Sequence, residues 1–158
     1  MGFLVWLESL PLAVWVVESP SVWAQPTILT LHTMGMAVLV GASWVLDLRL
    51  LGISRNVPLS AFRWVFRAVA VGLIVNLITG VLLFACRATT WGTAIPFLIK
   101  MCLVIASAAT LLPIRSYVLR SGPEQREVSG NARFLAIASI LTWSGAITAG
   151  RLLAYTVQ

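Results

Sequence analysis

Four long apolar runs determine what this chain can fold into. They cover residues 25–46, 62–85, 95–118 and 132–156. Each run reaches the roughly 20 apolar residues that a helix needs to cross the hydrocarbon core of a bilayer. In lipid, only helices and closed barrels satisfy all their backbone hydrogen bonds, and unbroken runs of this length indicate helices. The chain is therefore predicted to be an all-α integral membrane protein.

Short connections join these runs, so neighbouring helices are expected to run antiparallel. Residues 25–158 are predicted to form one four-helix antiparallel bundle, which leaves no room for a soluble catalytic domain. The composition agrees, because 59% of the residues are hydrophobic and only 10% are charged, with a mean hydropathy of +0.96. Soluble domains average about a quarter charged residues.

Residues 1–24 precede the first span and are apolar but interrupted. The interrupting residues are Glu8, Pro11, Glu18 and Pro20. A secretory signal peptide has a basic start and an unbroken apolar core, and this segment has neither. The favoured interpretation is an amphipathic helix lying on the outer surface of the membrane that the four helices span, with its tryptophans at headgroup level. These tryptophans are Trp6, Trp15 and Trp23. The alternative is cleavage of the segment after Ala24, since residues 21–24 resemble a cleavage site.

Basic residues are distributed unevenly between the two ends of the spans. The end formed by the first and third connections has Arg49, Arg55, Arg63, Arg67, Arg115, Arg120, Arg126 and Arg133. The opposite end has Arg87, Lys100 and Arg151. The positive-inside rule therefore predicts that both termini lie on the outer side of the membrane and that the first and third connections lie in the cytoplasm. The net charge of +6 needs no nucleic-acid partner, because the sequence has no recognition motif for one.

His32 is the only histidine, and it lies inside the first apolar run. An ionisable side chain within a span indicates a functional site, because lipid offers it no hydrogen-bond partner. Imidazole is a common ligand of metals and of haem iron. The alternative is a ring that bonds to a backbone carbonyl, or to Thr or Ser on a neighbouring helix. Asn76 and Thr79 in the second span are expected to form bonds across helices or to the backbone.

Three cations lie at the same outer level on the other spans: Arg87, Lys100 and Arg151. Cations around one imidazole suit an anionic cofactor, such as a haem with its two propionates, or a quinone headgroup. Gly35, one turn below His32, would let a flat ligand or another helix approach the backbone. The predicted cofactor site is His32, Gly35, Arg87, Lys100 and Arg151, with His32 as the metal ligand. No residue is predicted to be catalytic.

Copper handling is an alternative, because thioether and thiolate ligands suit copper. Its ligands would be His32, Met34 or Met36, and Cys102. Cys86 and Cys102 are too few for a disulfide framework. Two reduced, packed cysteines are expected, with a periplasmic disulfide as the alternative.

Asp47 ends the first span at the basic edge. An interfacial ion pair with a nearby arginine is expected to hold the first connection in place. The candidate partners are Arg49, Arg63 and Arg67. The alternative interpretation of Asp47 is a proton entry point.

Several motifs carry a resemblance over essentially the whole chain. They are LHxxG at 31–35, VG at 40–41, DLRLLG at 47–52, TGxLLF at 79–84, PFxxK at 96–100 and GRLLAY at 150–155. The chain thereby resembles a family of small uncharacterised four-helix bacterial inner-membrane proteins. It is more distantly similar to haem-dependent protoporphyrinogen oxidase and to copper-resistance membrane proteins. The first of these similarities implies that His32 ligates haem and that Lys100 contributes to activity.

The predicted function is a b-type haem-binding membrane protein. It would serve electron transfer, or anchor an oxidoreductase at the outer side of the membrane, rather than act as an independent enzyme. The alternatives are a structural or accessory subunit without a cofactor, and a copper-handling protein. A single histidine provides one axial ligand, so a haem would need five-coordinate iron, a non-histidine ligand or a partner subunit. The expected partners are the lipid bilayer and either a second copy or another redox subunit.

Overall fold

The computed structural model describes residues 2–122, 125 and 127–156, and all its regular elements there are helical. They are α1 (Gly2–Glu8), α2 (Pro11–Glu18), α3 (Gln25–Leu51), η1 (Leu59–Phe62), α4 (Val65–Ala85), α5 (Ala88–Trp91), α6 (Ile95–Arg120) and α7 (Gly130–Thr156). Four segments are long and apolar enough to span a membrane, namely α3, α6, α7 and η1 together with α4. The predicted all-α fold with four membrane-spanning helices is confirmed.

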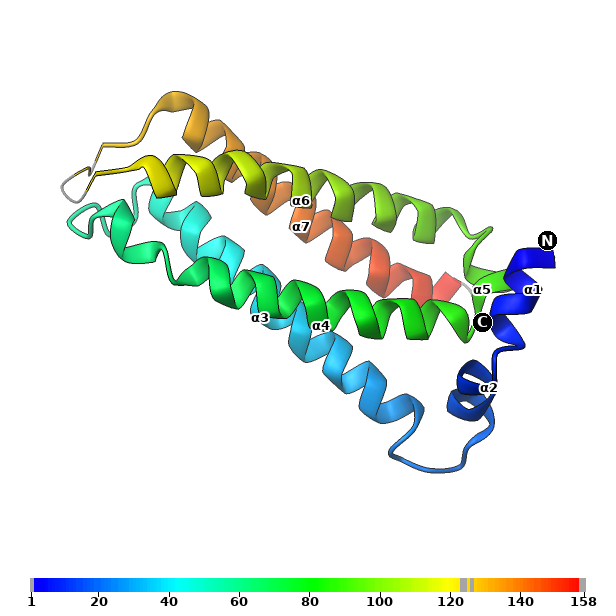
Figure 1. The fold of residues 1–158 in the computed structure, drawn as a ribbon. Helices are drawn as coiled ribbons and strands as arrows, with labels where there is room; N and C mark the ends of the chain where they lie inside the picture. The colour runs from blue at the N-terminus through cyan, green and yellow to red at the C-terminus, as the bar shows by residue number, and fades with distance from the viewer. Residues whose placement is uncertain (1, 123–124, 126, 157–158) are drawn as a thin grey trace.

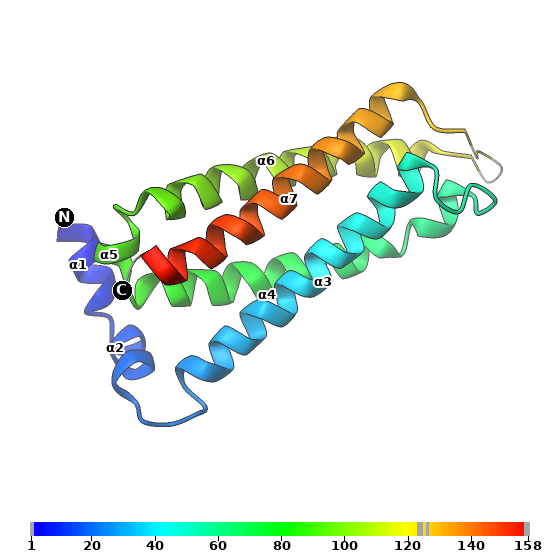
Figure 2. The ribbon, with the colours of Figure 1, turned by 180° about the vertical axis from the view of Figure 1, so that it is seen from behind.

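The long helices alternate in direction and form an elongated bundle (Figure 1). α3 packs along α4, α6 packs along α7, and the two pairs meet where α3 contacts α7. Seen from behind, α7 lies between α6 and α3 (Figure 2). The bundle is therefore two antiparallel helical hairpins joined mainly through α3 and α7.

α3 is longer than the apolar run that predicted it, because it ends at Leu51 rather than at residue 46. Gly52 ends the helix with a φ of 108°, and its N–H bonds to the carbonyls of Arg49 and Leu48. Glycine is favoured at such a left-handed position because it has no Cβ to clash with the backbone. Asp47 consequently lies inside the helix and not at its edge.

Two apolar clusters form the core. One contains Leu39, Val40, Leu46, Val65, Val69, Leu111 and Trp143. The other contains Leu50, Leu59, Ile114, Val118, Ala132 and Ala136. Outside them, large apolar side chains remain exposed, such as Leu77 at 63% and Ile105 at 64%. Apolar surface this extensive matches a lipid environment.

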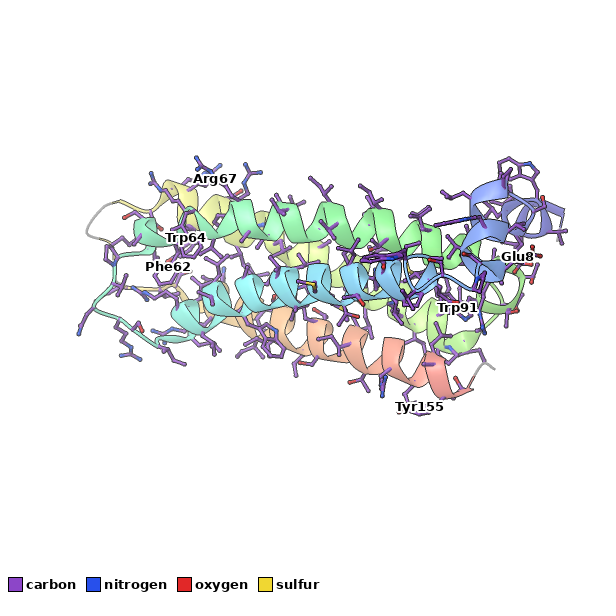
Figure 3. All side chains as sticks on the ribbon, turned by 90° about the horizontal axis from the view of Figure 1, so that it is seen from below. Glu8, Phe62, Trp64, Arg67, Trp91 and Tyr155 are labelled. Atoms are coloured by element: carbon purple, nitrogen blue, oxygen red, sulfur yellow. The ribbon has the colours of Figure 1, made fainter. Side chains whose placement is uncertain are left out.

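The N-terminal segment forms two short helices, α1 and α2, where a single helix was predicted. α1 packs against α5 at the end of the bundle that also holds the end of α7 (Figure 1). The Glu8 carboxylate accepts hydrogen bonds from the Thr89 backbone N–H at 2.9 Å and from the Thr89 hydroxyl at 2.8 Å. In Figure 3, Glu8, Trp91 and Tyr155 lie at this end, opposite Trp64.

The three N-terminal tryptophans remain at the surface of these short helices. Trp6 is 55% exposed, Trp15 is 51% exposed and Trp23 is 77% exposed. Indole rings favour the boundary between headgroups and acyl chains. An interfacial position for residues 1–24 therefore remains the prediction.

Candidate functional site

The candidate site depends on a close crossing of α3 and α4. A Cβ added to Gly72 would lie 2.7 Å from the backbone N of Leu39 and 2.9 Å from the carbonyl oxygen of Gly35. A Cβ added to Gly35 would lie 2.9 Å from Val75 Cγ1. Small residues let helix backbones approach closely in membranes. This approach brings His32, about one turn before Gly35, against the side chains of α4.

His32 has a defined hydrogen-bond arrangement at this crossing. Its Nδ1 lies 2.9 Å from Thr79 Oγ1, and the Thr79 hydroxyl lies 2.6 Å from the Val75 carbonyl oxygen. A hydroxyl has one hydrogen, which Thr79 donates to its own helix, so Thr79 accepts the bond from Nδ1–H. The lone pair of the neutral ring is therefore on Nε2, for which the described residues provide no hydrogen-bond partner. Histidines that bind metals through Nε2 are oriented in this way by a second group on Nδ1.

Two further residues of α4 hold the histidine. The Asn76 side-chain amide donates to the His32 carbonyl oxygen at 2.8 Å. Gly80 faces the ring, and a Cβ there would lie 3.2 Å from His32 Cε1. Asn76, Thr79 and Gly80 share one face of α4 because they are three and four residues apart. The ring is half-buried and its orientation is set by α4.

Lys100 reaches this region from α6. Its side chain lies across Gly150 of α7, where an added Cβ would be 3.4 Å from both Cδ and Cε of the lysine. The Lys100 ammonium lies close enough to act electrostatically on the His32 ring. Among the described residues no carboxylate pairs with this lysine, so its charge is available to an anionic group. The structure thus brings together two of the predicted site residues.

The other predicted site residues take different positions. The Arg151 guanidinium lies 5.1 Å from the Tyr155 ring centroid and donates to the Tyr155 hydroxyl at 2.9 Å. Arg87 follows the end of α4 and is exposed. Neither arginine has a described contact with His32. Gly35 packs against α4, so its observed role is helix packing.

The candidate copper ligands have different environments. Met34 is 61% exposed and Met36 packs against the apolar core. Cys86 and Cys102 are free thiols, and Cys86 Sγ lies 3.9 Å from the carbonyl oxygen of Ala13 in α2. Within the described ranges, no three His, Cys, Asp or Glu residues form a group that could hold a metal ion.

His32 lines neither of two hollows on the described surface. The first, of about 360 Å³, lies between α6 and α7 and is lined by Pro96, Ile99, Gly145, Thr148, Ala149 and Leu152. The second, of about 320 Å³, adjoins the end of α6 and is lined by Pro113, Ser116, Tyr117, Arg120, Ser121 and Gln125. A ligand of His32 would therefore bind outside these hollows.

Asp47 does not form the expected ion pair with a described residue. It is 0% exposed, and neither carboxylate oxygen has a hydrogen-bond partner within the described ranges. Arg49 Nε donates instead to the Val57 carbonyl oxygen at 2.9 Å. Arg63 donates to the carbonyl oxygens of Leu119 and Ser121. The prediction was wrong because α3 continues past Asp47 and directs this residue into the bundle. Arg49 and Arg63 bind carbonyl groups of the chain, and Arg67 is exposed.

A comparison with known protein families gives a match that covers the whole bundle. Residues 4–156 match the family of unknown function DUF6644. The chain belongs to this family. The DUF6644 match includes α1 and α2 as well as the four long helices, and it confirms the expected relation to an uncharacterised family. No curated protein matches the chain, and no solved structure matches it.

Proposed function

We propose that this protein binds a b-type haem through His32 and serves electron transfer or the anchoring of an oxidoreductase. The observation that carries the proposal is the hydrogen bond between His32 Nδ1–H and Thr79, which leaves the Nε2 lone pair available to a metal. The bond to Thr79 is also the one expected of a purely structural histidine, so the ligand role depends on the Nε2 lone pair that this bond leaves free.

The neighbouring residues fit one face of such a cofactor. Haem b would supply one-electron redox chemistry, and its propionates are anions that Lys100 can pair with. Gly80 and Gly150 let the His32 ring and the Lys100 side chain lie directly against α4 and α7. The chain has no second histidine, so the iron would be five-coordinate, or would take its other ligand from a non-histidine side chain or from a partner subunit.

We further propose that the site lies toward the periplasmic side of a bacterial inner membrane. Support comes from the exposed arginines at the other end of the bundle, among them Arg55, Arg63, Arg120 and Arg133. Basic residues concentrate on the cytoplasmic side of membrane proteins. Arg126, which contributes to the predicted bias, lies outside the described residues.

The visible spectrum of the purified protein tests the haem proposal. After expression with sufficient haem and purification in mild detergent, we expect Soret and α bands that change on reduction with dithionite. His32→Ala should lose these bands, whereas Met34→Ala, at an exposed position of the same helix, should keep them. Size-exclusion chromatography establishes that both variants are folded. A wild-type protein without bands, or unchanged bands in His32→Ala, would contradict the proposal.

The same preparation distinguishes the alternatives. If elemental analysis finds one equivalent of copper per chain that is lost in His32→Ala, this result would support copper handling as the function instead of haem binding. A folded protein with neither haem nor copper would indicate a structural or accessory subunit. Mass spectrometry of the intact protein would show at the same time whether residues 1–24 remain attached.

A further inference from the structure

A second polar centre lies near the opposite end of the bundle, around Asp47 of α3. Asp47 is the only aspartate in the chain, and its side chain is completely buried. Neither of its carboxylate oxygens has a hydrogen-bond partner among the described residues. An ionised carboxylate in such a place is costly, because complete burial desolvates its charge and no hydrogen bond from a described residue compensates for this.

Ser139 is the polar side chain that faces Asp47 from α7. It is also 0% exposed, and its hydroxyl has no described hydrogen-bond partner of good geometry. Ser43 and Ser107 are equally buried, but each donates to the carbonyl oxygen four residues earlier in its own helix, at 2.8 Å and 2.7 Å. Asp47 and Ser139 are thus two buried, unsatisfied polar groups on adjacent helices.

No described cation neutralises Asp47 from the helices packed against it. α3 packs against α4 and α7, whose basic residues nearest this end are Arg67 and Arg133. Both of these arginines are exposed. Arg49, on α3 itself, directs its Nε to the Val57 carbonyl oxygen. The negative charge on Asp47 therefore has to be removed by something that binds to the carboxylate itself.

We propose that Asp47 is a proton-binding site inside the membrane, in which the carboxyl group carries a proton and donates it to Ser139 Oγ. The neutral carboxyl has one hydrogen to donate, and Ser139 can accept it while giving its own hydrogen to a carbonyl of α7. Ser43 and Ser107 already donate to their own helices in this manner. One proton thereby satisfies both unpartnered groups and removes the buried charge.

A proton fits this place better than a metal ion does. Hard cations such as Ca²⁺ require about six to eight oxygen ligands. The backbone oxygens around Asp47 belong to α3 and α7, where they accept hydrogen bonds of the helices and are not free to coordinate a cation. The described residues also contain no acidic or histidine cluster that could complete a coordination shell.

The proposed proton site lies near one end of the bundle. Asp47 lies about one turn before the end of α3, close to the connection between α3 and η1. It is separated from His32 along the same helix by roughly 22 Å, at 1.5 Å per residue. The proton site is therefore distinct from the proposed haem site and does not depend on it.

Infrared spectroscopy of protein labelled with [¹³C-carboxyl]aspartate tests this proposal, since the label reports on Asp47 alone. At neutral pH we expect the C=O band of a protonated carboxyl that shifts in D₂O, converts reversibly to carboxylate at alkaline pH and is unaffected by sodium. Ser139→Ala should shift the band by removing its hydrogen-bond partner. Ser144→Ala removes a hydroxyl that bonds to the Ile140 carbonyl of the same helix, and should leave the band unchanged.

Three results would overturn the proposal. A carboxylate band at neutral pH in the folded protein would show that Asp47 is ionised. A protonated band that does not shift after long incubation in D₂O would show that its proton does not exchange. A band that responds to replacement of potassium by sodium would assign the site to a metal cation. The labelled wild-type protein suffices for all three measurements, so the result does not depend on whether a variant folds.

Discussion

Replacing Gly72 by alanine is expected to disrupt the crossing of α3 and α4. The new methyl group would lie 2.7 Å from the backbone N of Leu39 and 2.9 Å from the Gly35 carbonyl oxygen. These distances are about 0.7 Å and 0.5 Å short of ordinary van der Waals contact. Both contacts are with backbone, so no rotation of a side chain relieves them. The helices must separate over the whole crossing.

The cost of this separation can be estimated. A gap of about 0.5–1 Å loses a quarter to a half of the dispersion energy at each affected contact. Overpacking of a well-packed site costs about 1–3 kcal/mol, while glycine to alanine in a helix gains at most about 1 kcal/mol. We expect Gly72→Ala to lose about 1–2 kcal/mol of unfolding free energy on balance. The same movement should lengthen the hydrogen bond from His32 to Thr79.

Unfolding in mixed detergent micelles, followed by circular dichroism, measures this loss. Gly41→Ala is the matched control, because it lies on α3 and a Cβ there meets nothing within 4 Å. The control should be as stable as the wild type or slightly more stable. Equal stability of Gly72→Ala and Gly41→Ala would refute the close crossing as the basis of the site.

Further predictions concern the site and the N-terminal helices. Thr79→Val keeps the side-chain shape but removes the acceptor of the His32 bond, so it should cost about 1 kcal/mol in the same unfolding assay and change the haem spectrum of the loaded protein. Glu8→Ala removes two hydrogen bonds to Thr89 and should increase hydrogen exchange in α1 and α5, whereas Glu18→Ala, at an exposed carboxylate, should leave that exchange unchanged. Burial raises the pKa of the Cys86 thiol. A raised pKa leaves less thiolate near neutral pH, so in a Cys102→Ala background maleimide should react more slowly than with a free model thiol, and faster as the pH rises. A rate equal to that of the model thiol would contradict burial beneath α2.

The sequence predicted the first residue of a helix correctly where a proline occupies its first turn. The predicted first and third spans begin where α3 and α6 begin, because Pro26 and Pro96 occupy first-turn positions that suit proline. The end of α3 was predicted too early, since Asp47 and Arg49 interrupt the apolar run. Their polarity was taken for the membrane edge, although the helix continues to the glycine at position 52.

The sequence alone determined that the chain forms a bundle with four helices long and apolar enough to span a membrane, and it predicted that His32 and Lys100 lie at similar depths. Depth in a bilayer follows from counting residues along an apolar run, and each helical residue advances by a fixed rise. The rotation of each helix about its axis is not determined in this way, because it depends on which faces pack together. Only the tertiary structure therefore showed which side chains contact each other. His32 forms a hydrogen bond with Thr79, and Arg151 donates to Tyr155. Asp47 lies beside Ser139 of α7. The contact between Gly35 and Gly72 sets the approach of α3 to α4, and with it the environment of the one histidine.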